Sequence, residues 1–256
     1  MTYQEYCQLI QKQYRRLHPH LYSLRDEILV PSLIDAVRRG TPDALRRIYR
    51  EVHPQVYVFD MLQPRFCREL LEEAAAFEAW CDNRGLPLIR PNTMNNYGTV
   101  LDSIGFGPLL QQLMEQYILP FSARLYPDVG GDSLDSHHGF IVEYKVGKDT
   151  SLDFHVDASD VTLNVCLGKK FTGGTLYFRG IRCSHCQETP WQPEEEFEIE
   201  HAPGQAILHR GKHRHGANPI ISGERHNLIV WCNSSRFARN FDTTRCPAWC
   251  AGPGRN

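Results

Sequence analysis

The first half of the chain carries apolar residues at the spacing of amphipathic helices. Between residues 2 and 53 they recur three and four positions apart, which is the period of one helix face. Gly40 is typical of a helix end, and Thr41 followed by Pro42 is typical of the cap and first turn of the next helix. The same periodicity predicts two longer helices, over residues 64–80 and 107–125.

The second half of the chain has a different pattern. From about residue 136 it consists of short runs rich in β-branched and aromatic residues, most of them bounded by Gly, Pro or Asp. The predicted strands are residues 139–144, 161–167, 175–178, 205–208 and 227–231, with one earlier strand at 56–59. Because several strands at this spacing favour an antiparallel sandwich or jelly roll, the sequence predicts an α+β fold in which helices precede the sheets.

The composition is that of a protein with a packed core, with 41% hydrophobic and 23% charged residues. The formal net charge of −2 gives no overall field that would attract nucleic acid or an anionic membrane, so neither is expected as a partner. The first residues are polar, and no apolar run is long enough to span a bilayer. We therefore expect a cytoplasmic protein, in which most of the nine cysteines are reduced thiols.

Three separated residues have the composition of a metal site. His155 and Asp157 form a His-x-Asp pair, and residues two apart on an extended chain point to the same side. The pair alone has little weight, because surface residues fall at this spacing by chance. His215 follows 60 residues after His155 (215 − 155), a gap that lets a different strand close the site. Two imidazoles and one carboxylate with open positions form the facial triad of non-haem iron(II) oxygenases.

Arg225 adds a candidate anchor for an anionic ligand. It lies ten residues past His215 (225 − 215), after a turn expected at Ser222 and Gly223. That turn would place Arg225 on the neighbouring strand, deeper in the same cavity. A guanidinium in this position can hold the far carboxylate of a dicarboxylic acid in a two-pronged pair. The alternative is a surface ion pair, and the nearby metal triad favours the dicarboxylic acid.

Several segments resemble a known enzyme family. HVDASDVTLNVCLG, FTGGTLYF and PGQAILHRGKHRHGANPIISGERHNLIVW are similar, in this order, to the catalytic core of the prolyl and lysyl hydroxylase branch of the 2-oxoglutarate oxygenases. RPNTMNNYG, LYPDVGG, FIVEYKVG and CPAWC further resemble the group of 2-oxoglutarate- and iron-dependent oxygenase domain-containing protein 2. The resemblance spans residues 56–250 and is specific because the motifs form an ordered set. It implies a double-stranded β-helix (jelly roll) with flanking N-terminal helices.

The resemblance also implies a reaction and its cofactors. His155, Asp157 and His215 match the iron ligands, and Arg225 matches the residue that binds the 2-oxoglutarate tail. The implied cofactors are Fe(II), 2-oxoglutarate as cosubstrate and dioxygen, with ascorbate as reductant. A 2-oxoglutarate-dependent dioxygenase of this branch hydroxylates an unactivated C–H bond and releases succinate and CO2. The expected substrate is a lysine or proline side chain of a protein or peptide; a free amino acid or other small metabolite is the alternative.

Other residues around the expected site receive roles from the resemblance. Asn164 lies where lysyl hydroxylases place a cosubstrate contact, and Tyr144 resembles a tyrosine that hydrogen-bonds the same tail in some branches. Trp231 matches an aromatic residue of the cavity wall, and the alternative is a plain core position. His209 and His213 compete for the metal role, but neither begins the Gly-x-x-Pro and Ser-Gly-x-Arg run of the family.

Three other functions compete with this interpretation. A nucleic-acid demethylase on the same core typically carries a second arginine six residues after the first, where this chain has Trp231. A zinc hydrolase is expected to carry a His-Glu-x-x-His helix, which the sequence lacks. A catalytically silent jelly-roll module that recognises a partner can lose a metal ligand at little cost, and this sequence keeps the whole set.

Two cysteine pairs stand outside the oxygenase motifs. Cys183 and Cys186 form a CxxC pair in a predicted inserted loop, and Cys246 and Cys250 form a CxxxC pair in the CPAWC motif. Together they could build a structural four-thiolate zinc site. Free thiols are the alternative, because nothing in the sequence shows that the two pairs meet.

The chain is expected to have two parts. Residues 1–54 form an N-terminal helical extension, and residues 55–256 form the 2-oxoglutarate/Fe(II) dioxygenase domain, with a catalytic core over about residues 136–235. The extension is a dimer surface, a substrate-docking platform or simple packing against the barrel. The sequence does not choose among these three, and it leaves the oligomeric state open.

Overall fold

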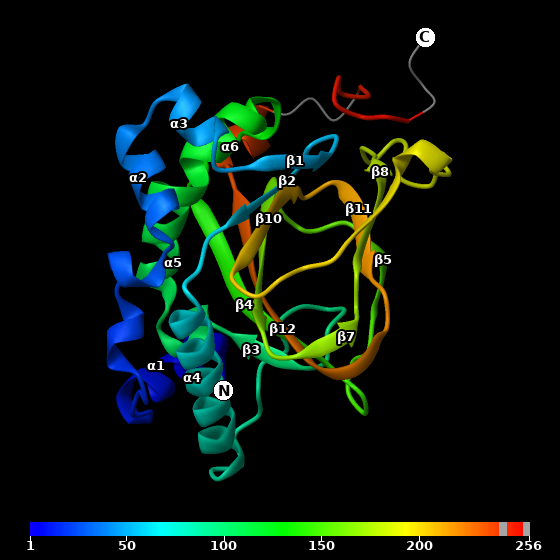
Figure 1. The fold of residues 1–256 in the computed structure, drawn as a ribbon. Helices are drawn as coiled ribbons and strands as arrows, with labels where there is room; N and C mark the ends of the chain where they lie inside the picture. Colours follow the sequence, from blue (N-terminus) through cyan, green and yellow to red (C-terminus); the bar gives the residue numbers. More distant parts are fainter. Residues whose placement is uncertain (241–244, 253–256) are drawn as a thin grey trace.

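The computed structural model describes residues 1–240 and 245–252, and it consists of two β-sheets with helices packed against one of them (Figure 1). The helices are α1 (Tyr3–Gln13), α2 (Pro31–Arg39), α3 (Pro42–Arg46), α4 (Pro64–Asp82), α5 (Gly107–Leu113), α6 (Leu119–Leu125) and α7 (Ser235–Asn240). The strands are β1 (Arg50–His53), β2 (Val56–Asp60), β3 (Gly98–Val100), β4 (Ser136–Lys145), β5 (Leu152–His155), β6 (Val161–Gly168), β7 (Phe171–Gly173), β8 (Leu176–Ile181), β9 (Glu196–Ile199), β10 (Gln205–Arg210), β11 (His213–Ala217) and β12 (Ile220–Asn233).

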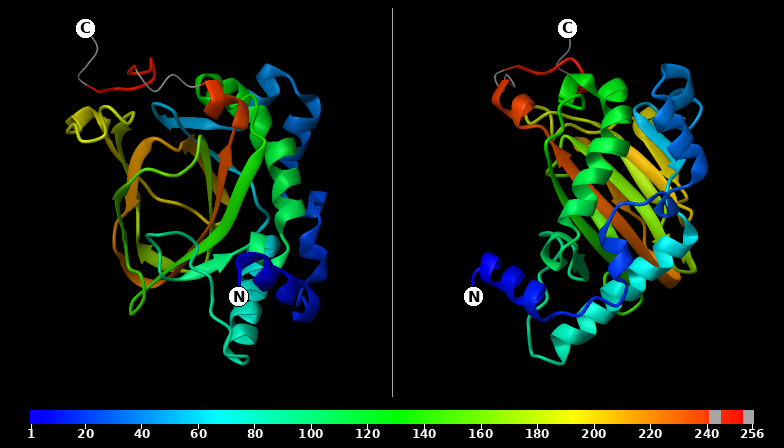
Figure 2. Two further views of the ribbon diagram at one scale, coloured as in Figure 1. Left: turned by 180° about the vertical axis from the view of Figure 1, so that it is seen from behind. Right: turned by 90° about the vertical axis from the view of Figure 1, so that its left-hand side faces the viewer.

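The two sheets face each other as the walls of a flattened barrel. The larger sheet has the order β1-β2-β10-β6-β12-β4-β3, and β7 pairs with β12 beside this path. The smaller sheet has the order β5-β11-β8-β9. The helices cover the outer face of the larger sheet, as the views from behind and from the side show (Figure 2). This is the double-stranded β-helix, or jelly roll, with flanking helices that the sequence predicts.

Burial along β6 explains how the larger sheet is held between two layers. All eight of its positions are buried, because helices cover one face and the smaller sheet covers the other. Leu163 and Val165 belong to the apolar core shared with the helices, whereas Thr162 and Asn164 line a cavity between the sheets. Successive residues of a strand point to opposite faces, so one short segment contributes both to the core and to the candidate site.

The predicted helix boundaries around Gly40 are confirmed. Gly40 ends α2 in the left-handed region, with φ of 62°, where a residue without Cβ is favoured. Thr41 caps α3 by accepting a hydrogen bond from the backbone N–H of Ala44 at 3.3 Å, and Pro42 occupies the first turn. The helical prediction is wrong at residues 50–53, which form β1. Gln55, with φ of 65°, turns the chain so that β1 pairs with β2.

The helix predicted over residues 107–125 is interrupted. A π-helical turn at Met114–Ile118 separates α5 from α6. Pro120 lies one residue after the start of α6, and a proline inside a helix removes a backbone donor and crowds the carbonyl four residues earlier. The wider π-turn directly before Pro120 accommodates this change, which periodicity alone does not predict.

The N-terminal helices share one apolar core with the larger sheet. Tyr6 and Ile10 of α1 and Leu33 of α2 belong to the same buried cluster as Leu163 of β6. The division into an extension of residues 1–54 and a domain of residues 55–256 stays a prediction. Within the described residues, no helix has both the length and the apolar surface required to cross a membrane.

One buried carboxylate fixes the segment after α1 to α4. Glu73 of α4 is fully buried and accepts hydrogen bonds from the hydroxyls of Tyr14 at 2.9 Å and Tyr22 at 2.8 Å. It also accepts the backbone N–H groups of Leu17 at 3.3 Å and His18 at 2.6 Å. Four donors from residues 14–22 therefore converge on one side chain. These donors satisfy both carboxylate oxygens of Glu73 and attach residues 14–22 to α4.

We expect Glu73→Ala to lower the free energy of unfolding by about 3 kcal/mol or more, because it leaves several buried donors without an acceptor. Glu72→Ala is the matched control, since Glu72 lies next to it on α4 with an exposed side chain. Urea unfolding followed by circular dichroism measures both variants. Equal stability of the two variants would contradict the role given to Glu73.

Candidate metal centre and cosubstrate pocket

The three predicted metal ligands meet at one place in the structure. His155 ends β5 and lies directly opposite His215 of β11, while Asp157 follows in the loop after β5. The Nε2 atom of His155 is 3.5 Å from Oδ1 of Asp157, and Nε2 of His215 is 3.7 Å from Oδ2. The three candidate ligand atoms all lie within 4.8 Å of one another. This separation allows one ion to contact all three.

Backbone carbonyls orient both imidazoles. Nδ1 of His155 lies 2.7 Å from the carbonyl oxygen of Asp153, and Nδ1 of His215 lies 2.8 Å from that of His213. A carbonyl can only accept, so each Nδ1 carries a proton, and in the neutral form of either ring Nε2 keeps the lone pair that a metal needs. Both lone pairs then belong to the atoms that face Asp157. Such outer contacts are typical of histidines that bind metals.

The charges of the site also suit a metal ion. Burial raises the pKa of Asp157, but the facing imidazoles of His215 and His155 more than offset this effect and hold its pKa below the ordinary range. Burial lowers the pKa of His215 to about 3, although Asp157 opposes the shift. The carboxylate is thus ionised and His215 is neutral at neutral pH, as metal binding requires. The hydroxyl of Thr162 donates to Oδ2 of Asp157 at 2.6 Å and fixes its direction.

The two competing histidines lie beside this group. His209 is fully buried, and its Nε2 is 4.0 Å from Oδ2 of Asp157, farther than the atoms of the triad. Its ring lies edge-on to His215 at 4.7 Å between centroids. His213 contributes its carbonyl to His215, and its own ring packs against Phe178. Both therefore shape the surroundings of the triad.

The expected turn at Ser222 and Gly223 is wrong. The chain reverses earlier, between β11 and β12, and both residues lie inside the long strand β12. Gly223 has a φ of 79° and bends β12 at the point where its pairing partner changes from β7 to β4 and β6. Arg225 is consequently on the larger sheet, opposite β11, and not on a strand paired with it.

Arg225 nevertheless points into the same cavity as the triad. It is 1% exposed, and its guanidinium donates to Oδ1 of Asn227 at 2.9 Å and to the carbonyl oxygen of Gly174. The ring of Tyr144 lies 5.3 Å from its guanidinium carbon. Across residues 1–240 and 245–252, no carboxylate forms an ion pair with it. Burial lowers the pKa of Arg225, as expected for a cation removed from water without an anionic partner.

The cavity between the sheets follows from strand alternation. Every second residue of β12, from Arg225 through Asn227 and Ile229 to Trp231, lines the cavity. The other lining residues come from the loop before β3 and from β4, β5, β6, β8, β11 and their loops: Asn92, Met94, Asn95, Phe140, Val142, Tyr144, Leu152, His155, Asp157, Thr162, Asn164, Leu176, His215 and Gly216. The candidate metal ligands and Arg225 thus share one cavity.

The residues assigned by resemblance also line this cavity. Asn164 accepts a hydrogen bond from Asn227 at 2.5 Å, and the hydroxyl of Tyr144 accepts one from Asn95 at 3.4 Å. Trp231 combines both of its expected roles, because it lines the cavity and packs edge-on against Phe140 at 5.0 Å between centroids. The cosubstrate contacts of Asn164 and Tyr144 stay predictions.

Sequence reasoning missed several lining residues. Asn92, Met94 and Asn95 belong to the RPNTMNNYG segment, whose three asparagines in five residues are an available signal for a polar wall. Asn227 links Arg225 to Asn164, and its position two residues after Arg225 on a strand was sufficient to place it on the same face.

Comparison with known proteins identifies the family. Residues 10–131 match the model of the OGFOD2-like domain. The chain is 45% identical over 254 residues to 2-oxoglutarate and iron-dependent oxygenase domain-containing protein ICU11 of Arabidopsis thaliana, covering 98% of this chain and 64% of the relative. It is 40% identical over 256 residues to 2-oxoglutarate and iron-dependent oxygenase domain-containing protein 2 of Homo sapiens, covering 96% and 69%.

More distant similarities extend to other oxygenases. A protein of Acanthamoeba polyphaga mimivirus named procollagen lysyl hydroxylase and glycosyltransferase is 29% identical over 194 residues, covering 72% of this chain and 20% of that protein. The crystal structure of the non-haem alpha-ketoglutarate-dependent carbocyclase SnoK from nogalamycin biosynthesis matches with a TM-score of 0.50 and 15% identity, covering 77% of this chain and 85% of that one. At this identity the likeness shows the fold alone. The chain belongs to the 2-oxoglutarate and iron-dependent oxygenase domain-containing protein 2 family.

Proposed function

We propose that this chain is an Fe(II)- and 2-oxoglutarate-dependent dioxygenase that hydroxylates an unactivated C–H bond on a lysine or proline side chain of a protein or peptide. Family membership supports the reaction class, and the chain spans only 64% of the length of its relative ICU11. The donor set of His155, Asp157 and His215 fits ferrous iron, because two neutral imidazoles and one carboxylate leave open positions on a metal.

The single observation that carries the proposal is the buried charge of Arg225. A buried guanidinium without a carboxylate partner is costly, and a diacid whose far carboxylate reaches it removes that cost. The planar guanidinium can hold the carboxylate by two parallel hydrogen bonds. Arg225 and the triad line the same cavity, so we expect one bound 2-oxoglutarate molecule to contact both.

The residues of the chain then supply position and shielding. When bound, iron(II) with 2-oxoglutarate supplies dioxygen activation, in which one oxygen atom enters the substrate and the other enters succinate as CO2 leaves. Arg225 fixes the far carboxylate of the cosubstrate, and Thr162 holds Asp157 in its direction. Phe140 and Ile229 in the cavity wall exclude water from the reacting atoms. Ascorbate is the reductant we propose for keeping the iron ferrous.

Exposed side chains beside the strand that carries His155 support a polypeptide substrate. Phe154 and Val156 flank His155 and are 38% and 37% exposed. Trp191 is 38% exposed, its ring lies 5.7 Å from that of Phe154, and the guanidinium of Arg179 lies 4.3 Å from it. These residues form an exposed aromatic and cationic patch, which offers contacts to a chain that continues beyond the reacting side chain. The similarity to a procollagen lysyl hydroxylase points to the same substrate class.

Replacing His155 by Ala removes one of three donors, and we expect Fe(II)-dependent conversion of 2-oxoglutarate to succinate to fall by more than about 100-fold while the fold persists. Substrate-independent succinate formation measures this. His20→Ala is the control, because His20 is a surface histidine paired with Glu69. Wild-type turnover in His155→Ala would refute the ligand assignment. If the unmodified protein showed no turnover and bound no iron, that result would instead favour a silent binding module.

Replacing Arg225 by Met should weaken 2-oxoglutarate binding by about 100-fold or more, because the carboxylate contact is lost. Metal binding is expected to persist because the triad is unchanged, although the hydrogen bonds of Arg225 to Asn227 and Gly174 are lost as well. Anaerobic calorimetry with Mn(II) as an inert metal separates the two affinities. Arg225→Lys should recover part of the loss, since it keeps the charge without the fork. Arg124→Met, on the exposed side of α6, is the control. Unchanged 2-oxoglutarate affinity in Arg225→Met would rule out the anchor.

Incubation with Fe(II), 2-oxoglutarate, ascorbate and a library of lysine- and proline-containing peptides should give products heavier by one oxygen. Trp191→Ala should raise the KM for peptide several-fold without changing uncoupled succinate formation, because Trp191 belongs to the exposed patch with Phe154 and Arg179. Leu88→Ala is the control, since Leu88 is equally exposed at 38% but lies outside this patch. If oxygen were transferred only to free amino acids or other small metabolites, the proposal of a peptide substrate would be wrong, and a metabolite would be the substrate.

A further inference from the structure

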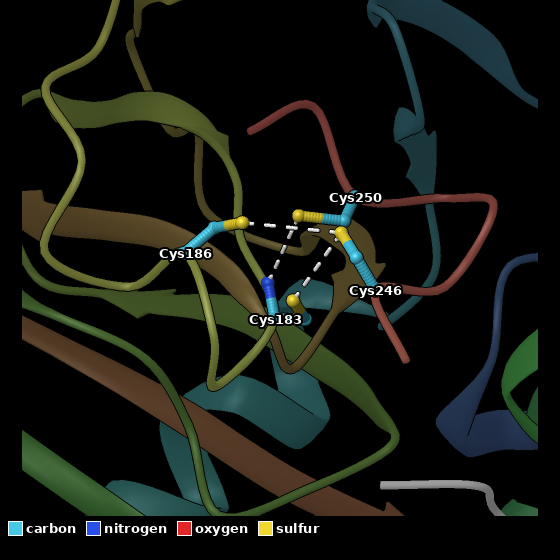
Figure 3. Close-up of side chains that lie close together, drawn as sticks. All are labelled: Cys183, Cys186, Cys246 and Cys250. Atoms are coloured by element: carbon cyan, nitrogen blue, oxygen red, sulfur yellow. Dashed lines mark hydrogen bonds between the residues drawn. The ribbon is translucent and has the colours of Figure 1, made fainter. Parts of the chain in front are cut away.

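The two cysteine pairs of the chain meet in space. Cys183 and Cys186 lie in the loop after β8, and Cys246 and Cys250 lie in residues 245–252 (Figure 3). Sγ of Cys246 is 3.6 Å from Sγ of Cys183 and 3.9 Å from Sγ of Cys186. All four sulfurs lie within 4.8 Å of one another, and three of the four cysteines are buried. The group is separate from the residues that line the oxygenase cavity.

We propose that Cys183, Cys186, Cys246 and Cys250 bind one structural zinc ion as thiolates. Zinc–sulfur bonds of about 2.3 Å in a tetrahedron place the sulfurs about 3.8 Å apart. The two sulfur–sulfur distances given above lie within about 0.2 Å of this edge. Binding displaces the thiol protons and involves no oxidation or reduction.

The backbone around the four sulfurs has the form of a ligand site. Each pair closes a tight turn, in which the N–H of Cys186 donates to the carbonyl of Cys183 at 3.0 Å and that of Cys250 donates to Pro247 at 3.1 Å. Sγ of Cys250 accepts the N–H groups of Cys183 at 3.3 Å and Gly252 at 3.4 Å. Backbone donors directed at a sulfur stabilise the thiolate form that a metal requires.

Glycine at position 252 is required by this close packing. A Cβ atom there would lie 2.6 Å from both Cβ and Sγ of Cys186 and 3.3 Å from Sγ of Cys250. The N–H of Ala251 also donates to the carbonyl of Ile181 at 3.0 Å, which attaches the segment to the end of β8. The tail is therefore held by close contacts in the two residues directly after Cys250.

Two buried arginines offset the charge of the proposed site. One Zn²⁺ with four thiolates carries a net charge of −2, and Arg182 and Arg214 both attract the thiolate of Cys250. Arg182 is also paired with Glu195 at 2.6 Å. Arg214 is 4% exposed and donates to the carbonyls of Thr189 and Arg179, and no carboxylate of the described residues forms an ion pair with it. An anionic metal site supplies the partner that this buried cation lacks.

Other uses of the four cysteines fit the structure less well. A two-iron cluster needs room for bridging sulfides between the cysteine pairs, whereas Cys183 and Cys246 come from opposite pairs and are 3.6 Å apart. All four thiols are free, with no disulfide among them. A single tetrahedral ion satisfies the four sulfurs together, and thiolate-only sets favour zinc.

The proposed ion would connect residues 245–252 to the sheet that carries a candidate iron ligand. Cys183 follows β8 by two residues, and β8 pairs with β11, where Phe178 lies opposite His215. Zinc at this point braces the end of β8 against the tail. We therefore expect its loss to lower thermal stability as well as metal content.

The test uses the full chain carrying His155→Ala and His215→Ala, purified without a metal-affinity tag. These two substitutions remove the candidate iron site, which could otherwise bind zinc as well. Mass spectrometry of metals should find about one zinc per chain. Adding Cys246→Ser and Cys250→Ser should reduce this to less than about a tenth. Cys7→Ser is the control, because Cys7 lies in α1 outside the cluster. Absence of zinc from the parent, or its retention in the double serine variant, would overturn the proposal.

A second measurement on the unmodified chain does not depend on the folding of a variant. An organomercurial that titrates the cysteines should release zinc into a zinc-sensitive dye, and exchange with Co(II) should give the charge-transfer absorption of tetrahedral cobalt thiolates. Both readouts are independent of oxygenase activity, so failure of the proposed function leaves them unaffected. Four freely reactive thiols, with no zinc released and no cobalt absorption, would refute the site.

Discussion

The pairing of β5 with β11 sets His155 directly across from His215, and the rest of the candidate site depends on it. Their rings lie 4.3 Å apart between centroids, and the carboxylate of Asp157 completes the group. Three polar groups this close in a buried place are stable together only when hydrogen bonds or a cation satisfy them. Carbonyl acceptors satisfy both Nδ1 atoms, which leaves the Nε2 atoms and the carboxylate for a shared ion.

The larger sheet contributes the other half of the site through simple alternation. Arg225 and Asn227 point inward from β12, while Leu228 and Val230, which follow them on the same strand, pack toward the helices. Packing of helices on the outer face therefore holds the inner face in register. This explains how the chain can place charged and amide groups in a buried cavity: the apolar residues next to them stabilise the same strand.

The sequence predicted the strands whose buried residues are apolar, and it did not predict a strand whose buried residues are mostly polar. The central strands of the larger sheet (β2, β10, β6, β12 and β4) were predictable because β-branched runs such as that of β6 are covered on both faces, whereas β1, β3 and β7 were not predicted as strands. β11 reads His-Arg-His-Gly-Ala, and all five positions are buried, yet nothing in its hydrophobic pattern marks a strand. Its polar residues are buried because they face the candidate metal site and the arginine contacts. Only the sequence motif around His215 indicated that β11 carries functional residues.

Long-range contacts account for the remaining differences. Glu73 lies in a helix whose apolar face was correctly predicted, but a buried carboxylate is rare and its partners are more than fifty residues away. Arg225 was placed correctly in the cavity through the wrong strand, because Gly223 bends β12 where a turn was expected. The meeting of Cys183 with Cys246 likewise depends on folding, which spacing alone does not reveal.

The candidate metal ligands and Arg225 stand on different sheets, and this arrangement has a consequence for selectivity. The gap between the two ends of a bound diacid is fixed by how closely the sheets stack, through side chains such as Phe178 and Phe140 in the layer between them. If Arg225 and the triad hold the two ends of a diacid as proposed, this spacing would set the length of diacid that contacts both. Discrimination among cellular keto acids would then reside in the apolar filling between the walls as much as in the charged groups.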